Sequence, residues 1–222
     1  MDYRDLLNEV KKYESRFTSN FPTERLYDNC ISPNYFNWKS LEESDTKKIF
    51  EFLNKWGRCR MKSRPLDLLI EYRKIATFSN ELRNLRLEEV DLDQIITVGN
   101  ESLTLKRVIH LVFDAISNIQ GFGAVPASKT LHLVSPSLIV MWDNAICLDL
   151  YHLKLNGYSY AYKFMPKMKE ELEGAINTCM EKEGLARAQA IKWLLDEIEN
   201  ICGTQRSLVK AIDEYNWSKA PR

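Results

Sequence analysis

The chain has 222 residues with 31 basic and 31 acidic side chains, and 45% of its residues are hydrophobic. A chain of this length and composition folds as one domain or two closely packed lobes, and it needs no disulfide or metal to hold a core. The formal net charge of zero excludes a globally basic nucleic-acid-binding protein but not a local basic face. The scarcity of glycine and proline excludes collagen-like and low-complexity chains.

The N-terminal residues 1–5 carry acids where a signal peptide carries bases, and no uncharged apolar stretch is long enough to span a bilayer. The five cysteines are odd in number, and no two of them have the spacing of a metal-ligand pair. We therefore expect a reduced, cytoplasmic protein with no membrane partner, no metal site and no cofactor.

Helical periodicity dominates the N-terminal half of the chain. Residues 2–17 place their apolar side chains on one face. Ser44 is expected to cap a helix that ends at Gly57, Pro65 to open the next helix, and Ser79 to cap a third.

The C-terminal half continues in the same way. The clearest helical pattern covers 103–119, where apolar residues recur at every third or fourth position. The only β-like run is 137–142, and a single extended segment cannot form a sheet, so the sequence predicts an all-α fold. The further predicted helices follow Pro126, begin near Asp143, cover 159–182 and 186–202, and run from a Thr204 cap to Tyr215.

A glycine-rich turn joins two predicted helices within the segment from Ile119 to Leu133. Gly121 and Gly123 can adopt positive φ and allow close backbone approach, and Pro126 preorganises the first turn of the helix that follows. The free N–H groups of such a turn suit a phosphate or carboxylate. The alternative is a plain connection between two helices without a ligand.

Lys129 and Asp143 stand on either side of the hairpin formed by this short helix and the β-like run. The run is long enough to return past the helix, so the sequence can place an amine and a carboxylate at two helix N-termini that face one cleft. The helix dipole and burial favour the neutral, nucleophilic form of such a lysine, and an aspartate suits an N-cap. The alternatives are a solvated surface lysine and a carboxylate that only caps its helix.

The segment from Gly121 to Ile146 resembles the helix–hairpin–helix DNA glycosylase superfamily, especially its lysine-bearing branches represented by endonuclease III and 8-oxoguanine DNA glycosylases. These proteins share a glycine-rich hairpin, a lysine at the start of the next helix, and an apolar stretch that leads to an aspartate. The resemblance implies that Lys129 is the Schiff-base nucleophile on the sugar C1′. It implies that Asp143 assists nucleophile activation and stabilises positive charge on the sugar.

The resemblance also implies a set of hairpin residues that hold a DNA-backbone phosphate: Gly121, Gly123, Ala124, Val125 and Ser128. A glycosylase must in addition extract its base and hold it between aromatic or apolar walls. The residues expected to form this base pocket are Trp142, Phe36, Trp38 and His132. The alternatives are aromatic residues that pin loops to the core and a histidine satisfied in the interior. The spaced cysteines that hold an iron–sulfur cluster in endonuclease III relatives are absent, so no cluster is expected.

We therefore expect a single compact unit, 1–222, with two lobes and a cleft between them. Residues 44–153 would form the hairpin-bearing lobe, and 1–43 together with 159–222 the second lobe. The expected function is removal of a damaged base, with an oxidised purine as the candidate substrate and AP lyase cleavage as a candidate second activity. The partner would be double-stranded DNA with its damaged base flipped out, bound by a monomer. The competing hypothesis is a non-catalytic helix–hairpin–helix module that binds nucleic acid or protein.

Charge is uneven along the chain. Residues 56–75 carry four more basic than acidic side chains, and the following acidic segments balance them. One interpretation is a phosphate-facing surface in the middle third of the chain. The other is a set of alternating, solvated faces.

Overall fold

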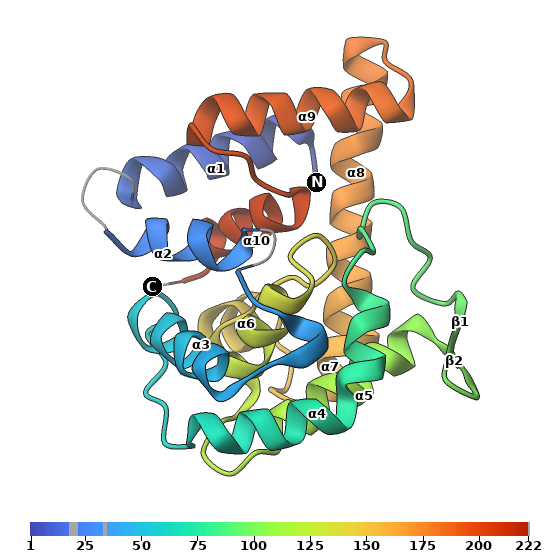
Figure 1. The fold of residues 1–222 in the computed structure, drawn as a ribbon. Helices are drawn as coiled ribbons and strands as arrows, with labels where there is room; N and C mark the ends of the chain where they lie inside the picture. The colour runs from blue at the N-terminus through green and yellow to red at the C-terminus, as the bar shows by residue number, and fades with distance from the viewer. Residues whose placement is uncertain (18–21, 33–34, 222) are drawn as a thin grey trace.

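The computed structural model describes residues 1–17, 22–32 and 35–221 of the chain. Nearly all regular structure in these residues is helical, which confirms the predicted all-α class (Figure 1). The helices are α1 (Tyr3–Phe17), α2 (Pro22–Ile31), α3 (Glu43–Lys55), α4 (Pro65–Leu82), α5 (Leu105–Ser117), α6 (Ala124–Val134), α7 (Gly157–Ser159), α8 (Met165–Glu183), α9 (Arg187–Cys202) and α10 (Leu208–Lys219). A 3₁₀ turn covers Trp38–Ser40, and π-helical turns cover Ala145–Leu150 and Tyr160–Phe164.

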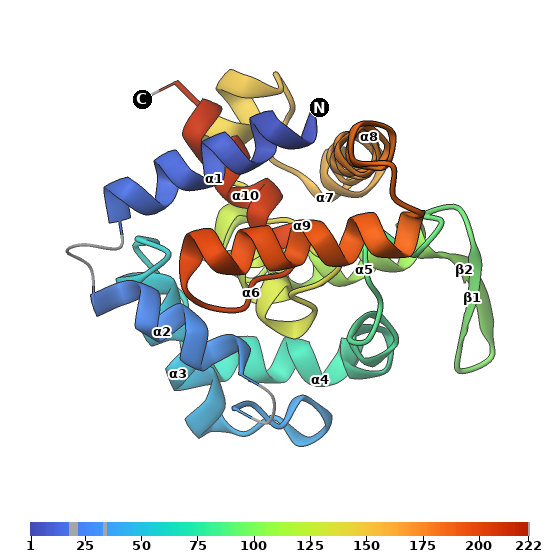
Figure 2. The ribbon, with the colours of Figure 1, turned by 90° about the horizontal axis from the view of Figure 1, so that it is seen from above.

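The helices pack in two groups that share contacts. Helix α1 lies against α8, α9 and α10, and α1 and α9 run side by side in both views (Figures 1 and 2). Helices α3 to α6 form the second group, in which α4 and α6 both pack against α5. Helix α2 packs against α3, and α10 contacts the turn Ala145–Leu150, so both contacts join segments assigned to different lobes. The division into two lobes stays a prediction.

Several helix ends follow the signals in the sequence. Thr104 caps α5 by accepting a hydrogen bond from the Arg107 N–H at 3.3 Å. Helices α8 and α9 end at Gly184 and Gly203, which adopt φ angles of +66° and +70°. Glycine tolerates this left-handed conformation without a Cβ clash.

A two-stranded antiparallel hairpin interrupts the helical pattern, and the prediction of a single β-like run was wrong here. Strands β1 (Ile95–Val98) and β2 (Glu101–Thr104) pair Ile95 with Thr104. Gly99, at φ +62°, makes the tight turn between them. The hairpin projects from the side of the molecule (Figure 1).

Three predicted helix caps were also wrong. Ser44 lies inside α3, whose N-cap is Glu42. Helix α4 continues through the buried Ser79, so Ser79 caps nothing, and the chain beyond Leu82 forms turns. One reason is a long-range bond, because the Leu87 N–H donates to the Ser137 carbonyl at 2.9 Å instead of joining a helix. The last helix is capped by Ser207 rather than Thr204.

Candidate functional site

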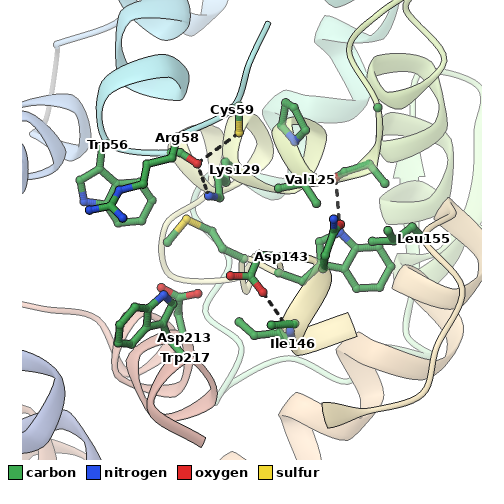
Figure 3. Close-up of a pocket in the computed structure, with 18 of the residues that line it drawn as sticks. Trp56, Arg58, Cys59, Val125, Lys129, Asp143, Ile146, Leu155, Asp213 and Trp217 are labelled. Carbon is green, nitrogen blue, oxygen red and sulfur yellow. Dashed lines mark hydrogen bonds between the residues drawn. The ribbon is translucent and has the colours of Figure 1, made fainter. Parts of the chain in front are cut away.

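A pocket of about 640 Å³ lies where four segments meet. These segments are the loop after α3, the start of α6, the residues around Asp143, and one face of α10, while Tyr13 of α1 and Leu155 complete the lining (Figure 3). A volume of this size lies within the range of small-molecule sites, roughly 300–1,000 Å³. Both predicted catalytic residues, Lys129 and Asp143, line it.

Asp143 reaches the pocket at the end of a buried, irregular segment. The apolar run 138–142 is at most 1% exposed, and it forms no strand. The Asp143 carboxylate accepts a hydrogen bond of 2.9 Å from the Ile146 N–H, so it caps the helical turn that begins there, as predicted. Figure 3 shows this carboxylate directed into the pocket between Lys129 and Asp213.

Side chains and the Ser135 carbonyl satisfy the backbone of this buried run, and that carbonyl accepts from the N–H groups of Leu138 and Ile139 at 3.1 and 3.0 Å. His132 donates through Nδ1 to the Ile139 carbonyl at 2.6 Å, and Tyr160 donates to the Val140 carbonyl at 2.6 Å. Ser128 Oγ lies 3.3 Å from both the N and the O of Trp142. Buried backbone groups need such partners. These three polar side chains therefore fix the path of the chain into Asp143.

Lys129 is the sixth residue of α6 and not in its first turn, because the helix begins at Ala124, before Pro126. The helix dipole is felt mainly within the first turn, so its effect on this amine is weaker than the sequence suggested. Lys129 Nζ donates to the Gly57 carbonyl at 2.8 Å and lies 5.5 Å from the centre of the Trp56 ring. These contacts hold the amine at the pocket wall (Figure 3).

The glycine turn contributes to two neighbouring surfaces. Gly123, at φ +84°, precedes the first helical residue, and Gly123, Ala124 and Val125 all line the pocket. The first N–H groups of a helix have no partner within it, so this end can accept an anion. Gly121, at φ +77°, faces elsewhere and lines an adjoining hollow together with Lys62.

Besides Gly121, four predicted site residues do not line this pocket. Ser128 and His132 are fully buried and support the run into Asp143. Phe36 and Trp38 are also buried, and the Trp38 ring packs 5.6 Å from that of Tyr72, beside a separate hollow. The alternatives named from the sequence, a satisfied interior histidine and aromatics that pin a loop, describe these residues better.

Trp142 borders the pocket from within the core. Its side chain is fully buried against Phe113, Tyr160 and Phe164, and its Nε1 donates to the Ala124 carbonyl at 3.3 Å. Trp142 therefore forms part of the packed floor under the pocket, where its ring has no open face for a base.

Burial controls the chemistry of His132. It lowers the pKa of this imidazole to about 3, although the hydrogen bond to Ile139 opposes the shift. The ring also bonds the Tyr27 hydroxyl at 2.8 Å. A neutral, doubly hydrogen-bonded imidazole of this kind is a structural group.

The pocket contains residues that the sequence did not assign to it. Trp56 and Arg58 come from the chain just after α3, and Asp213 and Trp217 come from one face of α10, where residues four apart are neighbours (Figure 3). Burial raises the pKa of Asp213 to about 6, and the nearby Lys210 ammonium opposes that shift. The i, i+4 spacing in α10 was the available signal, but only the fold brings this face to Lys129.

Within the described residues, one group has the composition of a metal site. The carboxylates of Glu14 and Glu214 and the Cys202 sulfur lie within 4.8 Å of one another. Two buried cations are also close, because Lys210 Nζ lies 3.0 Å and Arg206 Nε 4.0 Å from Glu214. These cations supply the charge that a metal ion would provide, so the cluster is best described as a buried ionic network.

Comparisons with protein-family models, with curated proteins and with solved structures give no match for this chain. None of the helices in the described residues combines the length and the apolar composition that crossing a membrane requires. All five cysteines are free thiols.

Proposed function

We propose that this protein is a DNA glycosylase that removes a damaged base, with Lys129 as its nucleophile and Asp143 as the assisting carboxylate. The observation that carries the proposal is their convergence. Lys129 and Asp143 come from opposite sides of a buried run, and both line one pocket beside a glycine turn. The resemblance of the segment from Gly121 to Ile146 to helix–hairpin–helix glycosylases supports the same assignment.

The proposed reaction displaces the base at the sugar C1′. The Lys129 amine forms a bond to C1′ while the bond from C1′ to the base nitrogen breaks, and the base leaves with the electron pair and takes up a proton. Loss of the amine protons and opening of the sugar ring then give an imine. The Asp143 carboxylate stabilises the positive charge that develops on the sugar.

The walls of the pocket suit an extruded base. Trp56 and Trp217 supply half-buried aromatic surface, and Asp213 supplies a carboxyl group that can accept or donate a hydrogen bond. A flipped base is held by aromatic or apolar walls and read through its hydrogen-bonding edge. The proposed partner is therefore double-stranded DNA bound by a monomer, and an oxidised purine is the first substrate to test.

Borohydride trapping tests the proposal because hydride reduces the imine to a stable protein–DNA crosslink. The parent is expected to crosslink to one member of a panel of duplexes, each with a single oxidised, deaminated or alkylated base. Lys129→Gln should reduce crosslinking at least a hundredfold, whereas Lys167→Gln, which changes an exposed lysine paired with Glu170, should not. Asp143→Asn keeps an oxygen for the cap and should crosslink more slowly.

Two outcomes would reject the proposal. One is trapping of Lys129→Gln at the parental level. The other is the absence of crosslinks and of base release by the parent over the whole panel. That result would favour the alternative hypothesis, a non-catalytic binding module.

A further inference from the structure

The loop between α3 and α4 carries an alternating pattern of exposure. Over 58–64, exposed and half-buried positions alternate without a break. This alternation places four side chains on the solvent side of the loop. The exposed positions are all cationic and are Arg58, Arg60, Lys62 and Arg64.

The backbone of this loop is fixed to its surroundings. The Cys59 N–H donates to the Leu53 carbonyl at 2.8 Å, which ties the loop to the last turns of α3. At the other end, a Cβ on Gly121 would lie 3.0–3.2 Å from atoms of Lys62 and Ser63, so the loop packs directly on the glycine turn. The cations therefore project from a supported backbone.

The loop connects the pocket with the hollow on the other side of the glycine turn. Arg58 and Arg60 line the pocket that holds Lys129. Lys62 and Arg64 line the neighbouring hollow that includes Gly121. Four cations thus run from the glycine turn to the proposed active site.

Two of the four cations have no acidic partner among the residues that the structure describes. Among the described residues, Arg60 and Lys62 have no carboxylate within 4.0 Å. Arg64 forms a bidentate pair with Asp67, with hydrogen bonds of 2.7 and 3.1 Å, but its side chain is 76% exposed and stays accessible to a second anion. Like charges held on one side of a loop repel one another, and a bound polyanion relieves that repulsion.

We propose that 58–64 is a docking track for the sugar–phosphate backbone of a DNA strand, which it leads toward the pocket. Each DNA strand presents a phosphate about every 3.4 Å along its axis, so phosphates recur closely along a strand that follows the loop. A strand along the track therefore presents a phosphate near each cation. The inference rests on the proposed function, because that function brings DNA to the pocket.

Salt dependence of binding to an undamaged duplex tests the track without any chemistry. The probe is a fluorescent duplex of ordinary sequence, titrated with the full chain between 50 and 200 mM salt. Arg60→Ala/Lys62→Ala should reduce the slope of log K against log salt by about 2, since each phosphate contact contributes about 0.9. The affinity advantage of the parent should therefore shrink about tenfold over this range.

Lys11→Ala/Lys192→Ala is the matched control. Both lysines are exposed, have no carboxylate within 4.0 Å among the described residues, and lie outside the pocket and the track, while the loss of charge is the same. The control should keep the parental slope. The track is rejected if Arg60→Ala/Lys62→Ala also keeps that slope, or if the parent does not bind the duplex at 50 mM salt.

The two proposals can fail separately. A parent that traps through Lys129 while the track variant binds with the parental slope would reject the track and keep the glycosylase. A parent whose duplex binding depends on Arg60 and Lys62, but which releases no base from any substrate, would keep the track and reject the glycosylase.

Discussion

Lys129 Nζ donates a 2.8 Å hydrogen bond to the carbonyl oxygen of Gly57, a residue 72 positions earlier in the chain. The same oxygen lies 3.4 Å from the Cys59 sulfur, so it accepts hydrogen bonds from two side chains of the pocket. A hydrogen bond to a fixed backbone atom limits the rotamers of a long lysine side chain. The position of the Gly57 carbonyl therefore determines where the amine of the proposed nucleophile, Lys129, lies.

Gly57→Ala tests this dependence. A Cβ at this position would lie 2.7 Å from the Leu53 carbonyl oxygen, a helix backbone atom that cannot easily move. We expect a loss of about 1–3 kcal/mol in the free energy of unfolding, because the chain must shift to relieve the overlap. Borohydride trapping should also fall, because the shift displaces the acceptor of Lys129. Urea denaturation and the trapping rate measure the two effects.

Gly184→Ala separates the two effects. Gly184 has a φ of +66°, and a Cβ there would meet nothing within 4 Å, far along the chain at the end of α8. This variant should lose about 1 kcal/mol through backbone strain and still trap at the parental rate. Equal trapping losses in both variants would mean that stability alone governs the result.

The sequence was sufficient for the local part of this site. The Asp143 cap, the turn at Gly123 and the presence of Lys129 and Asp143 at one pocket all involve residues within 121–146. The run 137–142 was correctly excluded from a sheet, but only the structure shows which side chains satisfy its backbone.

The distant part of the site depends on how helices pack. Trp56 and Asp213 reach the pocket from the chain just after α3 and from α10. No sequence pattern within either segment indicates that these two residues line the same pocket. The hairpin that begins with Ile95–Val98 differs from these contacts, because β-branched residues before a Gly-Asn turn are a strand signal within the sequence itself. Its register was readable from the sequence, whereas the neighbours of Asp213 were not.

Acid should destabilise the protein through His132. Its pKa is lowered to about 3 in the folded state, and an unfolded histidine titrates near 6.5. Between these values the unfolded chain binds the proton and the folded protein does not, so the stability that is complete above pH 6.5 is lost as the pH falls toward 3. From pH 7 to pH 5 this amounts to about 2 kcal/mol.

The comparison with His132→Gln isolates this contribution. Asp213, whose pKa is raised to about 6, acts with the opposite sign, because its folded form gains stability as the pH falls from 6 toward 3.8. Asp213 is present in both proteins and cancels in their difference. Urea titrations at pH 7 and pH 5 should show a smaller acid loss for His132→Gln, and equal losses would contradict a buried neutral imidazole.

The buried ionic network should be sensitive to its central cation. The Lys210 side chain is fully buried, lies 3.0 Å from Glu214 and 3.4 Å from Asp213, and faces the Tyr13 ring at 4.8 Å. Lys210→Met removes the cation that pairs with these two buried carboxylates. The free energy of unfolding, measured by urea denaturation, should fall by about 3–5 kcal/mol. The control is Lys219→Met in the same helix, where the lysine is exposed and the expected cost is below about 1 kcal/mol.

Arg58→Gly should move stability and DNA affinity in opposite directions. Arg58 adopts a φ of +50°, a left-handed conformation that costs a side-chain-bearing residue about 1–2 kcal/mol and costs glycine almost nothing. The greater flexibility of unfolded glycine offsets part of the gain, so unfolding should become harder by up to about 1 kcal/mol. Loss of the first cation of the docking track should reduce the salt slope for duplex binding by about 1.

Arg58→Asn provides the comparison that separates charge from backbone. Asparagine also lacks the charge, and it tolerates the left-handed conformation better than arginine but less well than glycine. Both variants should lose the same salt slope, while the gain in stability should be larger for Arg58→Gly. If Arg58→Gly unfolds more readily than the parent, the Arg58 side chain contributes more to the fold through its contacts than its backbone strain costs.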